Sequence, residues 1–442
     1  MRLMWSFLVS AIVVLLPGAA LSKSYDGYQV FRVFLKSRSH HKFIQTIVNE
    51  HSVSGEANLW SSSKFFSYAD LLVAPSQLNY VQKELKARRC KYRVTIHNVQ
   101  RLIDLTKGKR VKRSLPIPKV PDRRHAFSYK TYHTYAEIHD WIQNFAKAHP
   151  FLVSMKNLTK SFEGRDLLAL KIGSPGIWKP SVWIDSGMHA REWIAPATAI
   201  YLANYLVQNQ QSPRIRKLLT HFDFFILPLA NPDGYEHSWK EDRLWRKTRS
   251  VYMEHILQKH NYPQECVGVD VNRNWGFHWG EAGTDSNPCS NVYAGPRPFS
   301  EPESNAIKEF IRWEIPRLKL YLSLHSYGQF WLGAWGYASH KPNNYAEQEQ
   351  AARAAINAIY DISGSRYVYG TIADMLYPAS GTSIDYFQSA GVPYSFAVEL
   401  RPEEHEDTYG FLYPAEFIES TGREMLEGLV TAVEYIQRKH NL

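Results

Sequence analysis

Cysteine, charge and long apolar runs are all scarce in this chain of 442 residues. Only 3 residues are cysteine and only 21% are charged, whereas 44% are hydrophobic and 14% are aromatic. This composition excludes a disordered or fibrous protein, because enough apolar surface is present to form a buried core. At this length we expect at least two folding units.

One apolar run stands at the N-terminus, from Trp5 to Leu16. It is shorter than the roughly 20 residues that a membrane-spanning helix needs. Small residues that suit a signal-peptidase cut follow it at Gly18, Ala20 and Ser22. We therefore expect residues 1–22 to be a signal peptide and the product to be secreted and extracellular, with no membrane anchor.

Positive charge is concentrated in the front part of the chain. Residues 23–113 hold 18 basic and 6 acidic side chains, whereas residues 114–442 hold 33 basic and 36 acidic ones. A nucleic-acid-binding protein is expected to carry its basic patch on the binding fold itself. Since the excess lies in a segment that looks removable, we expect no nucleic-acid partner.

A multibasic motif, Arg110-Val111-Lys112-Arg113, ends this basic segment, and a proline-rich stretch follows it. Secretory-pathway proteases cut at such motifs, and the prolines keep the connector extended and accessible. We predict that an activating protease cuts between Arg113 and Ser114 and releases residues 23–113 as a pro-segment. A second basic pair, Arg123-Arg124, leaves a later final cut open, and a solvated charge run is the alternative interpretation.

Strand and helix patterns alternate along both parts of the chain. The pro-segment alternates over about 70 residues, which predicts a small open-sandwich α/β domain. In the later part, apolar runs predict buried strands at 181–185, 221–227, 318–324 and 394–400. Helical patterns occupy 135–148, 195–206, 301–314, 346–363 and 416–438. We therefore predict an α/β fold with a mixed, largely buried twisted sheet and helices on both faces.

The cysteines predict one disulfide. Cys266 and Cys289 lie 23 residues apart in a loop-rich stretch, and in an exported chain they are the natural pair. Such a bridge contributes about 3 kcal/mol when it is unstrained. Cys90 is left over and lies in the pro-segment.

The first motif with clear chemistry follows the apolar run at 181–184. His189 and Glu192 are three residues apart where the chain leaves a strand, so an imidazole and a carboxylate can converge on a metal. A catalytic zinc site uses three protein ligands, and His325, at the end of another apolar run, is a candidate for the third. Taken alone, the H-x-x-E spacing is weak and a core histidine is the alternative.

Six segments together resemble the zinc carboxypeptidases of the pancreatic A/B type, and the pro-segment resembles that family's activation segment. The six occur in the family's order: His189–Ile194, Asn231–Tyr235, Asp242–Arg249, Gly268–Trp275, His325–Tyr327 and Glu399–Arg401. The resemblance implies a zymogen with residues 114–442 as its catalytic domain. The mature enzyme would be a monomeric metallocarboxypeptidase, a hydrolase that uses one Zn²⁺ and acts on the C-termini of peptides and proteins.

The resemblance also implies the catalytic roles. His189, Glu192 and His325 would bind Zn²⁺, and Asp270 would orient His189 through its second ring nitrogen. Glu399 would take a proton from the attacking water and pass it to the leaving amine. Stabilisation of the negative charge on the former carbonyl oxygen would fall to Arg246.

An exopeptidase must also recognise a free C-terminal carboxylate, for which a bidentate guanidinium is suited. By resemblance that group is Arg273, helped by Asn272 and Tyr377. Further substrate-binding positions implied by the family are Arg191, Arg243, Ser326 and Tyr327.

The resemblance places Ile384 at the base of the side-chain pocket, where B-type enzymes carry an acidic residue. An apolar base disfavours Lys and Arg, because burying an unpaired cation is costly. Ala397 leaves room for large side chains, whereas Thr382 replaces the glycine of the best-known A-type enzymes. We therefore expect large hydrophobic or aromatic C-terminal residues. The alternatives are the same fold with basic or acidic specificity, or a non-catalytic binding protein, which the complete set of catalytic residues disfavours.

Overall fold

The computed structural model describes residues 22–51, 56–107, 127–251, 263, 266–403 and 408–442. The expected signal peptide up to residue 21 and the predicted cut between Arg113 and Ser114 lie outside these ranges. None of the described helices is long and apolar enough to cross a membrane.

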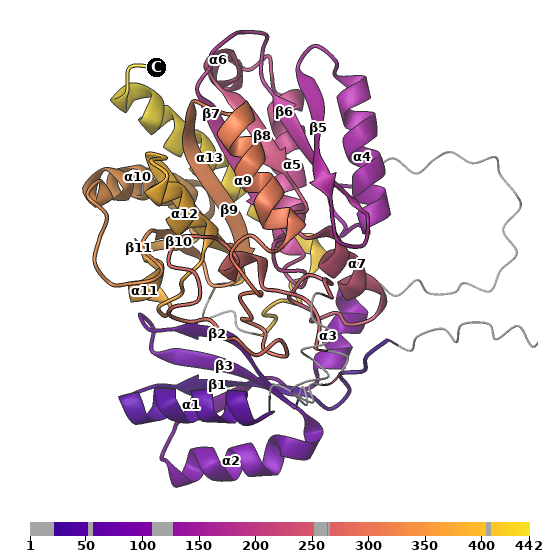
Figure 1. Ribbon diagram of the computed structural model, residues 1–442, viewed down its shortest axis with the longest axis vertical. Coiled ribbons are helices and arrows are strands. Elements are labelled where there is room, and N and C mark those ends of the chain that lie inside the picture. The colour runs from indigo at the N-terminus through magenta and orange to yellow at the C-terminus, as the bar shows by residue number, and fades with distance from the viewer. Residues whose placement is uncertain (1–21, 52–55, 108–126, 252–262, 264–265, 404–407) are drawn as a thin grey trace, which may run out of the picture.

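A four-stranded antiparallel sheet with the order β2-β3-β1-β4 forms the centre of the pro-segment. Its strands are β1 (Gln29–Phe34), β2 (Ala57–Ser63), β3 (Tyr68–Val73) and β4 (Tyr92–Ile96). Helices α1 (Arg38–His51) and α2 (Leu78–Ala87) cover the face that points away from the rest of the molecule (Figure 1). The other face and α3 (Val99–Thr106) share a hydrophobic cluster with residues of the catalytic part. The predicted open sandwich is therefore confirmed.

The second sheet has eight strands in the order β11-β10-β12-β9-β7-β8-β6-β5. It is mixed, because β5/β6, β6/β8 and β10/β12 are antiparallel and the other four pairs are parallel. Its strands are β5 (Val153–Lys160), β6 (Asp166–Ile172), β7 (Ser181–Ser186), β8 (Asp223–Leu227), β9 (Leu318–Ser326), β10 (Phe330–Gly333), β11 (Val368–Thr371) and β12 (Tyr394–Leu400). The prediction of a mixed sheet is confirmed.

Helices cover both faces of this sheet (Figure 1). The first face packs on α4 (Tyr135–Ala148), α5 (Ile194–Gln208), α6 (Pro213–His221), α10 (Tyr345–Ser363) and α13 (Ile418–Lys439). The second face packs on α9 (Pro302–Glu314), α11 (Ile372–Met375) and α12 (Ser383–Ser389). The connections contain α7 (Pro232–Lys240) and the short 3₁₀ turns η1 (Pro75–Gln77), η2 (Val271–Arg273) and η3 (Ala415–Phe417). A capping box explains where α4 begins, since Thr134 and Glu137 exchange side-chain and backbone hydrogen bonds.

Successive side chains along each strand point to opposite faces of the sheet. On β9, Leu320, Leu322 and Leu324 belong to the first core cluster and Tyr321 belongs to the second. Side chains at odd positions of β9 therefore lie on the second face, and His325 is one of them. Because β7, β9 and β12 are mutually parallel, their C-terminal ends meet at one edge of the sheet.

One disulfide joins Cys266 and Cys289, as predicted from the sequence. Its two cysteines enclose the stretch that contains η2 and lie before α9 begins. Cys90 is free and buried in the pro-segment.

Candidate active site

Three candidate ligands converge at the C-terminal ends of β7 and β9. His189 lies in the turn after β7, Glu192 lies just before α5, and His325 lies near the end of β9. The Nδ1 atom of His189 is 2.8 Å from Oε1 of Glu192 and 3.1 Å from Nδ1 of His325. The Nδ1 atom of His325 is 3.1 Å from Oε2 of Glu192. These separations fit a tetrahedral Zn²⁺ bound at 2.0–2.1 Å, whose ligand atoms would lie about 3.3 Å apart.

The hydrogen bonding of His189 and the charge of Glu192 support the same interpretation. Nε2 of His189 donates to Oδ1 of Asp270 at 3.1 Å, so the lone pair of its Nδ1 faces His325 and Glu192. Burial lowers the pKa of His189, and the charge of Arg246 adds to this effect. Although burial acts to raise it, the pKa of Glu192 is held well below its usual range by His189 and His325. Although burial acts to lower it, the pKa of His325 is raised by the neighbouring Glu192. Two imidazoles and a carboxylate are a donor set that zinc sites use.

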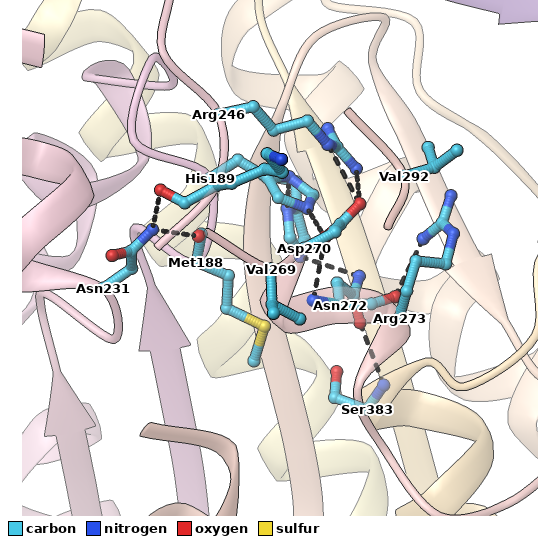
Figure 2. Close-up of polar contacts among 12 residues, drawn as sticks. Met188, His189, Asn231, Arg246, Val269, Asp270, Asn272, Arg273, Val292 and Ser383 are labelled. Carbon is cyan, nitrogen blue, oxygen red and sulfur yellow. Dashed lines mark hydrogen bonds and ion pairs between the residues drawn. The ribbon is translucent and has the colours of Figure 1, made fainter. Parts of the chain in front are cut away.

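Asp270 connects His189 to Arg246, and Figure 2 shows its carboxylate between the two side chains. Its Oδ2 accepts hydrogen bonds from Nε of Arg246 at 3.0 Å and from Nη2 at 2.8 Å. Against the effect of burial, Arg246 and His189 hold the pKa of Asp270 well below its usual range. Asp270 therefore stays charged and orients both side chains.

Glu399 lies on β12 directly opposite His325 of β9 in the register of the sheet. Its carboxylate lines the same cavity as the candidate ligands. Burial raises the pKa of Glu399 to about 8. A carboxylate with such a pKa is suited to exchange protons near neutral pH.

Arg273, Asn272 and Tyr377 form a second polar group in the cavity. Arg273 donates from Nε to the carbonyl oxygen of Gly283 at 3.0 Å, and its Nη2 donates to the Tyr377 hydroxyl at 3.3 Å. The amide oxygen of Asn272 accepts the N–H of Ser383 at 2.9 Å, which fixes the amide (Figure 2). The guanidinium is therefore held by neutral groups, and among the described residues no carboxylate within 4.0 Å neutralises it.

The cavity that contains these groups is open to solvent. Twelve of the residues named from the sequence line it: His189, Glu192, Arg246, Asn272, Arg273, His325, Ser326, Tyr327, Tyr377, Thr382, Ala397 and Glu399. Ser326 also donates its backbone N–H to Oε2 of Glu192 at 3.3 Å.

Two of the predicted arginines lie elsewhere. Arg191 lines a wider crevice between the pro-segment and the catalytic part, and its guanidinium lies 4.2 Å from the centre of the Phe411 ring. Arg243 is buried and does not reach the cavity. Its Nη atoms donate to the carbonyl oxygens of Arg191 and Phe411 at 2.8 and 2.9 Å, and its guanidinium stacks on Trp193. Arg243 therefore fixes the backbone at Arg191 and Phe411 without contacting the cavity.

One side of the cavity is apolar and is formed by Leu332, Ile372, Leu376, Ala379 and Ala397. Glu192 and Glu399 are the only carboxylates among the described residues that line the cavity. Ile384 does not line it directly. It is 1% exposed and packs in the same hydrophobic cluster as the apolar lining residues.

The pro-segment also lines the cavity, in agreement with the resemblance to an activation segment. Trp60, Ser61 and Ser62 of β2 lie among the lining residues. The Tyr327 hydroxyl donates to Oδ2 of Asp70 at 2.7 Å, and Asp70 forms a buried ion pair with Arg32. The polar sequence of β2 shows no clear strand periodicity, so the signal that would have located these contacts is weak.

Comparison with known proteins agrees with this geometry. A zinc carboxypeptidase family model matches residues 138–428, and a carboxypeptidase activation peptide model matches residues 31–106. The chain is 39% identical to carboxypeptidase B of Astacus astacus over 310 residues, which covers 70% of this chain and 98% of that protein. It is 35% identical to carboxypeptidase A1 of Bos taurus over 428 residues, which covers 96% of this chain and 97% of that protein.

A solved structure gives the same result for the fold. The crystal structure of the carboxypeptidase A from Helicoverpa armigera matches with a TM-score of 0.82 at 30% identity, and covers 95% of this chain and 99% of that one. The match spans both the pro-segment and the catalytic part. The chain has a His-Glu-His donor set at the edge of the sheet, and the activation peptide match precedes the catalytic match in the sequence. The chain therefore belongs to the zinc carboxypeptidase family.

Proposed function

We propose that the chain is a secreted zymogen whose cleaved form removes large hydrophobic or aromatic residues from the C-termini of peptides and proteins. In this proposal residues 1–22 are the signal peptide, residues 23–113 the pro-segment and residues 114–442 the catalytic domain. The observation that carries the specificity is the apolar wall of the cavity. Cleavage between Arg113 and Ser114, followed by release of the pro-segment, would free the cavity from Trp60, Ser61 and Ser62.

His189, Glu192 and His325 would hold the metal in this mechanism. When bound, Zn²⁺ supplies Lewis acidity that polarises the scissile carbonyl and makes water a stronger nucleophile. Glu399 accepts the proton of the attacking water and delivers it to the leaving amine. Its place opposite His325 in the sheet supports this role.

Arg246 stabilises the negative charge that develops on the former carbonyl oxygen. Its Nε and Nη2 are held by Asp270, and its Nη1 lies 4.0 Å from Glu192, so the guanidinium is fixed beside the candidate ligands. A donor that is already oriented needs no rearrangement during the reaction. Arg246 is therefore a pre-organised electrostatic group rather than a surface ion pair.

Arg273 binds the C-terminal carboxylate of the substrate, with Asn272 and Tyr377 beside it. A guanidinium without a carboxylate partner in the described structure is a ready site for such an anion. Tyr327 and Ser326 extend the substrate-binding wall, and the Tyr327 hydroxyl is released from Asp70 when the pro-segment leaves. Arg191 and Arg243 act further out, Arg191 along the crevice and Arg243 as its support.

The apolar wall and Ile384 favour a hydrophobic side chain over a basic one. A Lys or Arg side chain buried against this wall would lose hydration without gaining a partner, at a cost of several kcal/mol. Asp385 lies next to Ile384, but its carboxylate accepts the backbone N–H groups of Gly336 and Tyr337. Relatives named carboxypeptidase A and carboxypeptidase B are both similar to the chain. The proposed specificity therefore rests on the residues of the pocket and not on the names of the relatives.

The test is the release of C-terminal residues from matched peptides that end in Phe, Leu, Lys or Glu by the cleaved protein. We expect kcat/KM to be at least tenfold higher for Phe and Leu than for Lys and Glu. Ile384→Asp is the matched variant, and it should increase the release of Lys because a carboxylate would then lie in the hydrophobic cluster that contains the apolar lining residues. Preferential release of Lys or Glu by the wild-type enzyme would contradict the proposed specificity.

A further inference from the structure

The two candidate histidine ligands differ in the hydrogen-bond partner of Nε2, the ring nitrogen that points away from the other ligands. Nε2 of His189 donates directly to the carboxylate of Asp270. Nε2 of His325 instead lies 3.1 Å from the hydroxyl of Ser323, which is two residues earlier on β9 and on the same face of the strand. The Ser323 hydroxyl in turn donates to Oδ1 of Asp185 at 2.7 Å.

The register of the sheet builds this chain of contacts. Asp185 of β7 and Ser323 of β9 are direct neighbours on adjacent parallel strands. Both residues are fully buried, and Trp183 donates its indole N–H to the other oxygen of Asp185 at 2.8 Å. Both oxygens of the buried carboxylate are therefore engaged, and its position is fixed.

The hydrogens along the chain can be assigned. The single hydroxyl hydrogen of Ser323 goes to the carboxylate, which leaves the oxygen of Ser323 as an acceptor for His325. His325 then carries its hydrogen on Nε2, and the lone pair of its Nδ1 points toward Glu192 and His189. The amide nitrogen of Asn272 lies farther from Nε2, at 3.5 Å, so the shorter contact with Ser323 sets the tautomer.

We propose that Asp185 and Ser323 are positioning residues that hold His325 in the tautomer and ring orientation required for zinc binding. Asp270 orients His189 by a direct hydrogen bond, whereas Asp185 orients His325 through the hydroxyl of Ser323. Partners of this kind typically contribute 10- to 100-fold to metal affinity. The inference rests on the proposed function, in which His325 is a zinc ligand.

A purely structural role is the competing explanation, since the contact also joins β7 to β9. The two explanations differ in their effect on zinc. Loss of a structural bond lowers the stability of the zinc-free and zinc-loaded forms equally and leaves the zinc affinity unchanged. Loss of a positioning bond weakens zinc binding, so the increase in Tm caused by zinc becomes smaller.

The test measures the zinc dissociation constant of the cleaved protein by competition with a chelator, together with the Tm of the zinc-free and zinc-loaded forms. Ser323→Ala should weaken zinc binding 10- to 100-fold, and Asp185→Asn should weaken it less. The double variant should bind zinc no more weakly than Ser323→Ala, because Asp185 acts only through Ser323. Ser395→Ala is the matched control, since Ser395 is equally buried on β12 but donates to the carbonyl oxygen of Ile384.

Weaker zinc binding in Ser323→Ala and Asp185→Asn, with an unchanged Kd in Ser395→Ala, would support the inference. If the zinc Kd is unchanged in both Ser323→Ala and Asp185→Asn, while the wild-type enzyme binds zinc and is active, this inference alone is overturned. Failure of the cleaved wild-type protein to bind zinc would overturn the proposed function and this inference together. If Ser323→Ala does not fold, Asp185→Asn and Ser323→Thr, which keeps the hydroxyl and should retain zinc affinity, decide the question.

Discussion

At the residue scale, the proposed chemistry depends most on Glu399, which lines the cavity opposite His325. Glu399→Gln keeps the size of the side chain but removes the proton acceptor. We expect kcat to fall by roughly 10²- to 10⁴-fold, with a smaller change in KM, because a general base acts mainly on the chemical step.

The zinc content of this variant is its control. Glu399 is outside the His-Glu-His group, so the variant should still bind one zinc ion per chain. A variant that keeps more than a tenth of the wild-type kcat would contradict the role of Glu399 as the base.

Asp385, at the start of α12, gives a prediction about pH. Burial raises the pKa of Asp385 to about 7, although its carboxylate accepts two backbone N–H groups. The folded state therefore binds a proton more readily than the unfolded state, whose carboxyl has a pKa near 3.9. The contribution of Asp385 to stability is consequently lost as the pH rises from about 4 to about 7.

The free energy of unfolding of the wild type should therefore fall relative to that of Asp385→Asn as the pH rises. The expected decrease is on the order of 2 kcal/mol between pH 5 and pH 7. Urea unfolding of both proteins at the two pH values measures it. A difference between the two proteins that is the same at both pH values would contradict the raised pKa.

Resemblance located the residues with chemical roles and Asp270, which orients His189, but not the residues that contact the second ring nitrogen of His325. His189, Glu192 and His325 stand in recognisable motifs and lie together as predicted. Ser323 and Asp185 are adjacent to those motifs, but their contact depends on the register of β7 and β9, which the sequence does not reveal. The period of two between Ser323 and His325 is the one local signal that pointed to this contact.

At the element scale, strongly periodic segments were predictable and short or polar ones were not. The helix predicted at 135–148 coincides with α4, because it has a capping box and one clear apolar face. Edge strand β5 has few buried positions, and β10 and β11 have four residues each, so their patterns are too weak or too short to detect. Their positions follow from pairing in the sheet rather than from local sequence.

Strand β2 provides a prediction about latency. Trp60 of β2 lines the cavity and packs on Phe411, with ring centroids 5.3 Å apart. In the uncleaved chain, Trp60→Ala should open the cavity and raise the hydrolysis of a small C-terminal substrate several-fold. After cleavage and removal of the pro-segment, the variant and the wild type should have the same kcat/KM.

That equality is the internal control, because Trp60 belongs to the segment that is removed. The prediction would be wrong if the uncleaved variant were no more active than the uncleaved wild type. A difference that persists after removal of the pro-segment would instead show that the substitution impaired folding.

At the scale of the whole molecule, the pro-segment and the catalytic part carry opposite net charge. Their sequences give net charges of +12 for residues 23–113 and −3 for residues 114–442. The described contacts between them include the Lys23–Asp242 ion pair at 3.4 Å, beside the hydrogen bond from Tyr327 to Asp70. Charge attraction between the two parts is screened by salt.

After cleavage without separation of the parts, the residual inhibition by the pro-segment should therefore weaken as the NaCl concentration rises from 0.05 to about 0.5 M. Activity of the purified catalytic part at the same two salt concentrations is the control. Inhibition that does not change with salt would show that apolar and backbone contacts alone hold the pro-segment, such as those of Lys64 and Phe65 with the carbonyl oxygens of Leu376 and Met375.

The most direct measurement of the central claim compares two peptides that end in Phe, one with a free C-terminal carboxylate and one with an amide, with and without a chelator. The cleaved protein should release Phe from the free acid alone, lose this activity in the chelator and regain it when Zn²⁺ is restored. Those results would follow from the His-Glu-His site and from Arg273 as the carboxylate receptor. Release that persists in the chelator, or equal cleavage of the amide, would contradict the account.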